Sequence, residues 1–337
     1  MTTVFVTGIS GYIGSHCAVK LLENNYVVKG SVRNIEKSKT FIKQIVAKAG
    51  VNKTIDTVCL DLLDEHGWEE ALSGCDYLLH VASPFAIAEP KDSNDMIIPA
   101  LEGTKRILAA AKKVGIKKVV LTSSLVAMVG DRKLNHLTQE SWSNADKDKI
   151  SVYMKSKTYA EKAAWDFYHH QSGDDKMELT VINPGPVYGP PVLDRIDGAS
   201  MGFFCQVLSG KMDQMPPCSY PMSDVRDIAD IHVKAIDNIS SNGQRLIVTT
   251  DDSYGFIDVG KLLSENGYLK KEPKLAPVFL LKILSLFNSE LKGMMPFIGA
   301  KVTADNSAPK KLFNWTPIPF EKTVLDTAKS LTELKSF

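Results

Sequence analysis

The order of apolar segments along the chain limits the folds that it can adopt. Seven stretches rich in β-branched and aliphatic residues alternate with mostly amphipathic stretches. They fall at residues 2–7, about 26–32, 54–60, 77–82, 117–122, 178–183 and 245–250. The two at 117–122 and 178–183 have the nearly continuous apolar runs of strands that are buried on both faces. Because strands that alternate with helices form parallel sheets, we predict an α/β fold with a doubly wound parallel sheet.

A glycine-rich turn follows the first of these segments. Three glycines stand at intervals of three residues, G-x-x-G-x-x-G, between the segment at 2–7 and a helical stretch at 16–23. Glycine allows a tight turn and a close approach of the backbone to a pyrophosphate, and free N–H groups at the start of a helix attract phosphate. The turn therefore predicts a nucleotide site. Its expected contacts with the nucleotide are Gly8, Gly11, Tyr12, Ile13 and Gly14.

One tyrosine is placed for proton transfer. Of the ten tyrosines only Tyr153 has a lysine, Lys157, four residues later, and this spacing puts both side chains on one face of a helix. A phenol has a pKa of about 10, which is too high for efficient proton exchange at neutral pH, but a neighbouring ammonium group lowers that pKa. The pair therefore indicates acid–base chemistry. A chance pair on the protein surface is the alternative.

Six motifs occur in an order that is known from one family. They are Gly8-x-x-Gly11-x-x-Gly14, Asp61-Leu62, His80-Val81-Ala82-Ser83-Pro84, Thr122-Ser123-Ser124, Tyr153-x-x-x-Lys157 and Asn183-Pro184-Gly185-Pro186-Val187-Tyr188-Gly189-Pro190. From about residue 2 to 330 the chain resembles the extended short-chain dehydrogenase/reductases, and most of all the branch of dihydroflavonol, cinnamoyl-CoA and methylglyoxal or aldehyde reductases. The resemblance implies a Rossmann-type dinucleotide-binding domain over residues 1–183, rejoined by a strand near 245–250, and a mostly substrate-binding lobe over residues 184–337.

The resemblance also implies a role for each residue of the acid–base group. Tyr153 would donate a proton to a carbonyl oxygen as hydride arrives from a nicotinamide, and Lys157 would hold the nicotinamide ribose and lower the pKa of the phenol. Ser124 would hydrogen-bond the same oxygen, with Ser123 as the competing candidate. The alternative for either serine is a backbone cap at the end of a strand. The further cofactor contacts implied are Asp61, Leu62, Val81, Ala82, Ser83, Thr122, Pro184, Val187 and Ser200.

The end of the second β-rich segment bears on the choice of cofactor. In proteins that bind NAD an acidic residue here accepts hydrogen bonds from the adenosine ribose, whereas an arginine accommodates the 2′-phosphate of NADP. This segment ends in Arg33 with no carboxylate before Glu36, and Lys37 lies one helical turn further on. Because arginine can bind phosphate through two hydrogen bonds, we predict NADP(H). A solvated basic helix face is the alternative, and it suits Lys39 and Lys43 better than Arg33.

Apolar side chains predict the character of the substrate pocket. Those in or near the loops expected around the nicotinamide are Phe85, Leu125, Met128, Phe203, Phe204, Met215 and Tyr220. Core packing is the alternative role for each of them. We predict an NADPH-dependent reductase of an apolar or aromatic aldehyde or ketone, flavonoid-like compounds included. The alternatives are a nucleotide-sugar epimerase or dehydratase, which would hold NAD tightly, and a non-catalytic NADPH-binding regulator, which would lack the tyrosine or the lysine.

Composition and charge argue against nucleic-acid-binding, membrane-binding and metal-binding proteins. The chain has 40 Lys and Arg against 39 Asp and Glu, a formal charge of +1, and no basic stripe interleaved with aromatic residues, so we expect neither nucleic-acid nor membrane binding. The five cysteines lack a C-x-x-C pair and the seven histidines lack a ligand spacing, so no metal is predicted. The apolar run at 276–287, interrupted by Lys282, is too short to span a bilayer and predicts a packed helix. With no leader pattern, we expect a cytoplasmic monomer or homodimer that acts on a small molecule.

Overall fold

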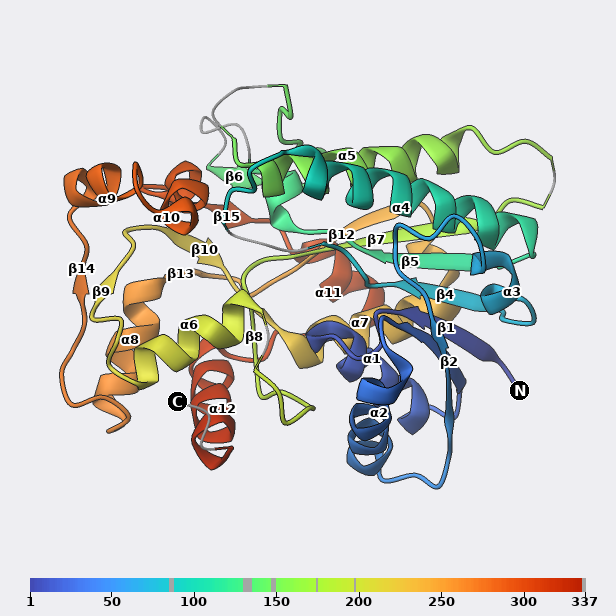
Figure 1. Cartoon of the computed structure of the whole chain (residues 1–337), viewed down its shortest axis with the longest axis horizontal. Helices are drawn as coiled ribbons and strands as arrows, with labels where there is room; N and C mark the ends of the chain where they lie inside the picture. Colours follow the sequence, from blue (N-terminus) through green and yellow to red (C-terminus); the bar gives the residue numbers. More distant parts are fainter. Residues whose placement is uncertain (85–87, 130–134, 147–149, 174, 197, 335–337) are drawn as a thin grey trace.

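A parallel sheet of seven strands forms the centre of the protein (Figure 1). The computed structural model describes residues 1–84, 88–129, 135–146, 150–173, 175–196 and 198–334. The strands lie across the sheet in the order β12-β7-β5-β4-β1-β2-β3. They are β1 (Thr3–Thr7), β2 (Val27–Val32), β3 (Ile55–Cys59), β4 (Tyr77–His80), β5 (Lys118–Thr122), β7 (Glu178–Pro184) and β12 (Gln244–Val248). The first and last residues of each strand lie within two residues of the bounds of one predicted segment. The predicted doubly wound α/β fold is therefore confirmed.

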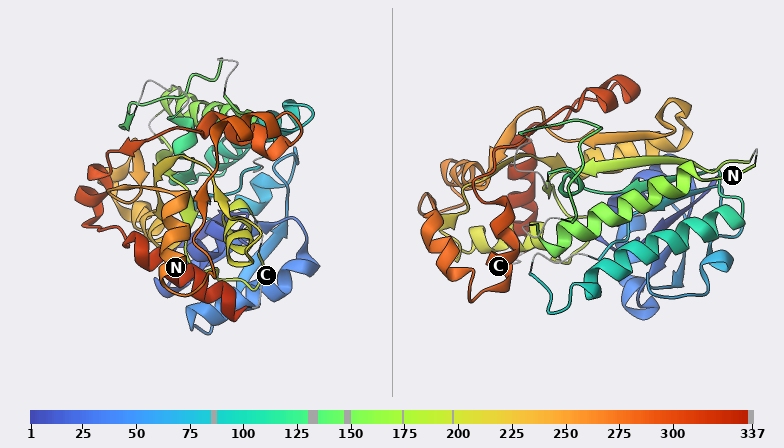
Figure 2. Two further views of the ribbon diagram at one scale, coloured as in Figure 1. Left: turned by 90° about the vertical axis from the view of Figure 1, so that its left-hand side faces the viewer. Right: turned by 90° about the horizontal axis from the view of Figure 1, so that it is seen from above.

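Helices cover both faces of this sheet (Figures 1 and 2). On one face α4 (Asn94–Lys113) and α5 (Val152–His169) pack against each other, with α3 (Trp68–Leu72) beside α4. On the other face α1 (Tyr12–Glu23) packs between α2 (Ile35–Ala49) and α7 (Val225–Asp237). Most residues of α7 are buried, because the helix packs against both the sheet and α1. Because α7 and β12 come from the second half of the chain, both halves build the α/β domain.

The direction in which the chain winds across the sheet reverses between β1 and β4. From β1 the strands follow to β2 and β3 on one side, and from β4 they follow to β5, β7 and β12 on the other. Such a reversal leaves a crevice at the carboxyl ends of the strands, where ligands of open α/β sheets bind. The loops after β1 and β4 meet there, since a Cβ on Gly8 would lie 3.1 Å from the Cβ of Ala82.

The glycine turn after β1 is too tight for a side chain at its third glycine. Gly8 has a φ of 64°, in the left-handed region that favours glycine. Its carbonyl oxygen accepts a hydrogen bond from the N–H of Gly11 at 2.8 Å. A Cβ on Gly14 would lie 2.4 Å from that same oxygen. The first turn of α1 can therefore approach the turn this closely only with glycine at position 14.

A smaller lobe lies at the carboxyl ends of the strands (Figure 1). Its helices are α6 (Ala199–Leu208), α8 (Phe256–Glu265), α9 (Val278–Leu284), α10 (Ser289–Met294) and α12 (Phe320–Glu333), while α11 (Ser307–Phe313) packs against β12 and α7. Its short strands are β6 (His136–Leu137), β8 (Val187–Tyr188), β9 (Gln214–Met215), β10 (Ser219–Pro221), β11 (Ser223–Asp224), β13 (Ser253–Gly255), β14 (Lys274–Leu275) and β15 (Thr303–Ala304). The α12 helix packs on α6 and α8 around buried Phe204 and Val259, which gives the lobe a core of its own.

The apolar run at 276–287 does not pack as its sequence predicts. It forms α9, and within α9 only Leu281 is buried. Phe279, Leu286 and Phe287 are 69%, 77% and 86% exposed. The prediction of a packed helix is therefore wrong, because an apolar run shows that a segment can be buried but not that the fold brings a surface to cover it. Across the described ranges, no helix combines the length and the apolar character that crossing a bilayer requires.

We expect Gly14→Ala to lower the free energy of unfolding by about 1–3 kcal/mol, because its methyl group must displace the backbone of the glycine turn. Gly202→Ala is the matched control, since Gly202 also lies inside a helix and a Cβ there meets no atom within 4 Å. Alanine is favoured over glycine in helices by about 0.5–1 kcal/mol, so this variant should be at least as stable as the parent. Urea unfolding followed by circular dichroism compares the three proteins. Equal stability of the two variants would contradict the close approach at Gly14.

Candidate active site and cofactor groove

Tyr153 and Ser124 meet at the carboxyl edge of the sheet. Ser151 caps α5, and its hydroxyl accepts a hydrogen bond from the N–H of Met154 at 3.2 Å, so the helix begins just before Tyr153. Ser124 follows β5 and forms a hydrogen bond with the phenol of Tyr153. Both side chains are half-buried, whereas Lys157, one turn further along α5, is only 7% exposed. The tyrosine and the lysine that the sequence pairs thus share the face of α5 that is turned toward the sheet.

The two candidate serines have different partners. The hydroxyl of Ser123 donates a hydrogen bond to the carboxylate of Glu161 at 2.5 Å, and the residue is buried. The hydroxyl of Ser124 accepts a hydrogen bond from the N–H of Val126 at 3.3 Å, in addition to its bond with Tyr153. Backbone capping therefore does occur at Ser124, together with the contact to the phenol. That contact favours Ser124 over Ser123 as the residue beside the reacting oxygen.

Burial dominates the electrostatics of the tyrosine and the lysine. It raises the pKa of the Tyr153 phenol above its ordinary value, and the hydrogen bond with Ser124 offsets part of the rise. Burial also lowers the pKa of Lys157 to about 8, although the attraction of Glu161 acts to raise it. The expected lowering of the phenol pKa by Lys157 is therefore wrong for the protein without its cofactor, because burial raises that pKa. Tyr153 is protonated at neutral pH, as a proton donor must be.

A buried carboxylate links α5 to three strands of the sheet. Glu161 lies one turn after Lys157 on the same face of α5 and is 1% exposed. It accepts hydrogen bonds from Ser123, which follows β5, and from the side-chain amide of Asn183 in β7, the latter at 2.8 Å. It also forms an ion pair with Arg245 of β12. These contacts fix the rotation of α5 about its axis, and with it the direction of the tyrosine and the lysine. The sequence analysis missed Glu161 and Arg245.

A small cavity lies beside Lys157 and Glu161. Its volume is about 10 Å³, which is close to the room that one water molecule needs. Its polar lining consists of His80, Ser83, Thr104, Thr122, Ser123, Lys157 and Glu161. Burial lowers the pKa of His80 to about 3, with a further contribution from the charge of Lys157, so this imidazole is neutral. The lining therefore suits one bound water between the ammonium and the carboxylate.

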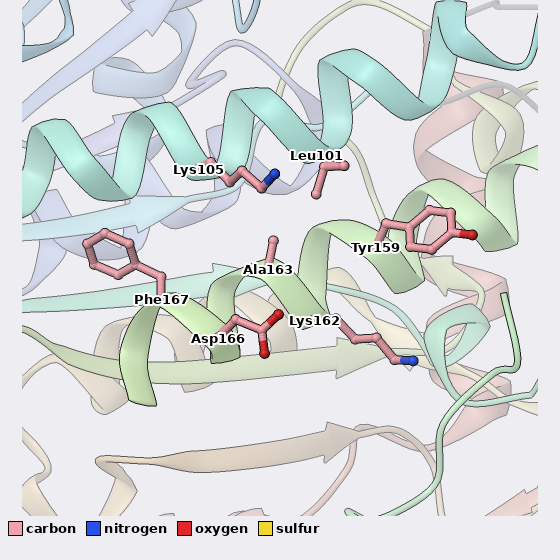
Figure 3. Close-up of a pocket in the computed structure, with 7 residues that line it drawn as sticks. All are labelled: Leu101, Lys105, Tyr159, Lys162, Ala163, Asp166 and Phe167. Atoms are coloured by element: carbon pink, nitrogen blue, oxygen red, sulfur yellow. The ribbon is translucent and has the colours of Figure 1, made fainter. Parts of the chain in front are cut away.

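A larger hollow of about 440 Å³ lies on the outer side of α4 and α5 (Figure 3). Its lining residues are Leu101, Lys105, Tyr159, Lys162, Ala163, Asp166 and Phe167. At 3.6 residues per turn, Tyr159 and Lys162 lie on the side of α5 opposite to Tyr153 and Lys157. This hollow belongs to the solvent side of the helix and is separate from the candidate active site.

Thr7 and Ser31 hold the loops around the glycine turn together. The hydroxyl of Thr7 accepts hydrogen bonds from the N–H groups of Val81 at 3.0 Å and Ala82 at 2.9 Å. The hydroxyl of Ser31 accepts a hydrogen bond from the N–H of Gly8 at 3.1 Å. The predicted cofactor residues Val81 and Ala82 are thus fixed to the end of β1. The sequence analysis missed Thr7 and Ser31, because a hydroxyl residue at the end of a strand has no distinctive pattern.

Three cationic residues lie near the start of α2. Arg33 and Lys37 are exposed at the end of β2 and in the first turn of α2. The guanidinium of Arg195, from the lobe, lies 4.9 Å from the ring centroid of Phe41, which stands one turn after Lys37. Burial lowers the pKa of Arg195, and the positive charge of Arg33 lowers it further, so the two guanidinium groups are close enough to repel each other. Such a cluster attracts phosphate. Arg195 was missed because it is far from Arg33 along the chain.

The other predicted cofactor residues lie in several different elements. Thr122 hydrogen-bonds the ring of buried His232 at 2.7 Å, and the hydroxyl of Tyr12 donates to the carbonyl oxygen of Gly189 at 2.7 Å. Asp61 and Leu62 follow β3, Ser83 follows β4, Pro184 ends β7, Val187 begins β8, Ser200 lies in α6, and Ile13 lies in the first turn of α1. In the described part of the chain, no three His, Cys, Asp or Glu residues are grouped so as to hold a metal ion.

The predicted substrate residues divide between two apolar clusters. Phe203, Phe204 and Met215 belong to the core under α12, and Leu125, Met128 and Tyr220 belong to a cluster around Met154 of α5. Met128, Phe204 and Met215 are fully buried, which fits the alternative role of core residues. Phe203 is half-buried and stacks on Tyr188 with the ring centroids 6.2 Å apart. Phe85 lies outside the described residues.

The fold and the site together define a dinucleotide-binding α/β protein with a tyrosine and a lysine at the carboxyl edge of its sheet. The sequence model of the NAD dependent epimerase/dehydratase family matches residues 4–248. The chain belongs to this family, whose members are extended short-chain dehydrogenase/reductases, so the predicted family is confirmed.

Characterised reductases are similar to the chain over most of its length. The NADPH-dependent methylglyoxal reductase GRE2 of Saccharomyces cerevisiae is 31% identical over 363 residues, covering 99% of this chain and 99% of that protein. Cinnamoyl-CoA reductase 1 of Arabidopsis thaliana is 35% identical over 252 residues, 73% of this chain and 70% of that protein. The crystal structure of Gre2 from Candida albicans in complex with NADPH superposes with a TM-score of 0.81 at 26% identity, covering 99% of both chains.

We expect Glu161→Gln to lower the free energy of unfolding by about 3–5 kcal/mol, because it leaves the buried guanidinium of Arg245 without a countercharge. Glu102→Gln is the matched control, since it removes an exposed ion pair with Lys105 one turn away and should cost less than about 1 kcal/mol. Guanidinium chloride unfolding measures both. Similar losses for the two variants would show that Glu161 does not hold α5 to the sheet.

Proposed function

We propose that this protein is an NADPH-dependent carbonyl reductase, which transfers a hydride to an aldehyde or ketone and forms the alcohol. The observation that carries the proposal is the contact of Tyr153 with Ser124 at the carboxyl edge of the sheet, with Lys157 one turn away on α5. The similarity to proteins named as NADPH-dependent methylglyoxal reductase and cinnamoyl-CoA reductase supports it.

The groove fits NADPH at both ends. At the glycine turn, no side chain caps the N–H groups at the start of α1, so they are available to a pyrophosphate, and Gly14 leaves room for a close approach. At the start of α2, the cations Arg33, Lys37 and Arg195 suit the 2′-phosphate that distinguishes NADPH from NADH. The similar Gre2 structures from yeast and from Candida albicans contain NADPH.

The side chains of the site have complementary parts in the reduction. When bound, NADPH supplies the hydride from its nicotinamide ring. The hydroxyl of Ser124 hydrogen-bonds the carbonyl oxygen of the substrate as negative charge develops on it. Tyr153 donates its proton to this oxygen, which becomes basic as the hydride arrives. Lys157 holds the nicotinamide ribose, and its positive charge stabilises the phenolate that remains. In the oxidation of an alcohol the same residues act in reverse.

The two alternative functions have weaker support. An epimerase or dehydratase shares the fold, and the UDP-glucose 4-epimerase of Thermotoga maritima superposes with a TM-score of 0.77, but at 19% identity this is a likeness of fold alone. The residues after Ser124, Leu125-Val126-Ala127, include none of the acids that dehydratases use to eliminate water. A non-catalytic regulator would be expected to lack Tyr153 or Lys157, and both are present.

An apolar or aromatic carbonyl compound is the substrate class that we propose. Phe203 of α6 is half-buried, and its ring packs edge-on against Phe256 with the ring centroids 5.0 Å apart. Such a ring can contact an aromatic substrate through the face that the protein leaves uncovered.

Tyr153→Phe should lower turnover with NADPH and an aromatic aldehyde by about 10²–10⁴-fold while leaving the affinity for NADPH little changed, since the hydroxyl that delivers the proton is lost. Tyr159→Phe is the control, because Tyr159 lies on the solvent side of the same helix, where its hydroxyl donates to Asp146 at 3.2 Å. Steady-state kinetics and NADPH fluorescence titrations measure the two effects. A purified Tyr153→Phe protein with near parental turnover would refute the proposed proton donor.

Arg33→Asp should lower kcat/KM for NADPH by roughly one to two powers of ten, because it removes a charge-assisted contact to the 2′-phosphate and places a carboxylate nearby. The efficiency with NADH should hold or rise, since the carboxylate can accept a hydrogen bond from the free ribose hydroxyl. Arg195→Met should lower kcat/KM for NADPH but leave kcat/KM for NADH unchanged. Lys43→Asp, on the exposed part of α2, is the control and should leave the ratio of the two efficiencies unchanged. If Arg33→Asp kept the parent's ratio of efficiencies with NADPH and NADH, the cofactor selectivity would lie in another residue, with Lys37 as the next candidate.

A further inference from the structure

The apolar run around α9 forms the main exposed apolar patch of the described protein. Seven of the eleven exposed large hydrophobic side chains in the described part of the chain fall between residues 275 and 287. These seven, which we call the α9 patch, are Leu275, Val278, Phe279, Ile283, Leu284, Leu286 and Phe287. Single exposed apolar residues are ordinary on a protein surface, but a contiguous group of large ones marks a binding surface.

The α9 patch projects from the protein. The helix lies at one end of the long axis, on the outer edge of the lobe (Figure 1). At 100° per residue, the exposed side chains from Val278 to Leu284 span about 240° of the helix circumference, and Leu281 anchors the remaining side. A flat protein surface covers one side of a helix. A soft medium into which the helix can sink covers all of the exposed sides together.

Lysines flank the α9 patch along the chain, and Lys282 lies within it. Residues 270–292 contain five lysines and two glutamates, a local net charge of +3 in a chain whose total is +1. All five lysines are exposed, and they are Lys270, Lys271, Lys274, Lys282 and Lys292. Lysine is depleted in protein–protein interfaces, whereas lysines mixed with Phe and Leu side chains are the composition of segments that lie in the headgroup region of anionic bilayers. The chain-wide charge, on which the sequence analysis relied, conceals this local excess.

We propose that the α9 patch docks the protein on the surface of a membrane that contains anionic lipids. Phe279, Leu286 and Phe287 enter the boundary between headgroups and acyl chains, and the five lysines contact the lipid phosphates and carboxylates. The inference goes beyond the proposed reductase function and does not depend on it.

The docking surface is joined to the candidate active site by two hydrogen bonds. The carbonyl oxygen of Ser289, at the start of α10, accepts a hydrogen bond from the N–H of Glu89 at 3.1 Å. The carboxylate of Glu89 in turn accepts one from the N–H of Val152, the residue before Tyr153, at 3.1 Å. A bilayer at α9 therefore lies on the same side of the protein as the start of α5.

Cosedimentation of the purified full-length protein with sucrose-loaded vesicles tests the proposal. The vesicles consist of phosphatidylcholine alone or with one third phosphatidylserine. We expect binding to the anionic vesicles, weaker binding to the neutral ones, and a decrease at high salt. Phe279→Ser combined with Phe287→Ser should weaken binding at least about ten-fold, since each removes a large apolar contact. Lys282→Glu should weaken binding to anionic vesicles at least about five-fold.

Control variants on other surfaces separate binding through the α9 patch from non-specific binding to vesicles. Leu63→Ser combined with Ile239→Ser removes two exposed apolar side chains, 57% and 82% exposed, that lie outside the α9 patch. Lys329→Glu reverses the charge of an exposed lysine in α12. Both controls should bind vesicles as the parent does, and thermal unfolding shows that each variant is folded.

Two results would overturn the proposal. One is a parent protein that binds neither kind of vesicle, or binds both equally at every salt concentration. The other is a parent that sediments as a dimer without vesicles and becomes a monomer on the Phe279→Ser and Phe287→Ser substitutions, which would assign the α9 patch to contact between two copies of the chain.

Discussion

The arrangement of the site depends on a carboxylate that the fold removes from water. Burying Glu161 is costly unless its charge is paired, and the protein pairs it with Arg245 and with hydrogen bonds from Ser123 and Asn183. Those partners come from three neighbouring strands, so α5 can occupy only one rotation about its axis without breaking them. Because Tyr153 and Lys157 stand two turns and one turn before Glu161, that rotation points the phenol at Ser124.

The buried groups around the site determine its pKa values as well as its geometry. Burial removes water from Lys157 and lowers its pKa to about 8, and the negative charge of Glu161 limits this decrease in pKa. Burial raises the pKa of the Tyr153 phenol, which is protonated at neutral pH. At the far end of the groove the cations Arg33 and Arg195 repel each other, which a phosphate between them would relieve.

Local sequence patterns predict the parts of the protein that local physics determines. The buried strands, the glycine turn and the Tyr153–Lys157 pair follow from apolar runs and from short spacings. The contacts of Glu161 with Arg245 and of Arg195 with the start of α2 join distant segments, and no local pattern encodes them. The direction of the Tyr153 pKa shift was predicted wrongly because it depends on burial, which a spacing does not report. The exposure of Phe279 was missed for a related reason, since an apolar run does not show which surface covers it.

The transfer of a labelled hydride tests the central claim most directly. The protein is incubated with NADPH that carries deuterium on one or the other face of nicotinamide C4, together with a panel of aldehydes and ketones that includes aromatic aldehydes and methylglyoxal. Mass spectrometry then locates the label in the products. A carbonyl reductase gives an alcohol with one deuterium on the former carbonyl carbon, from one of the two labelled cofactors and not the other. The absence of labelled alcohol with both cofactors across the panel would contradict the account.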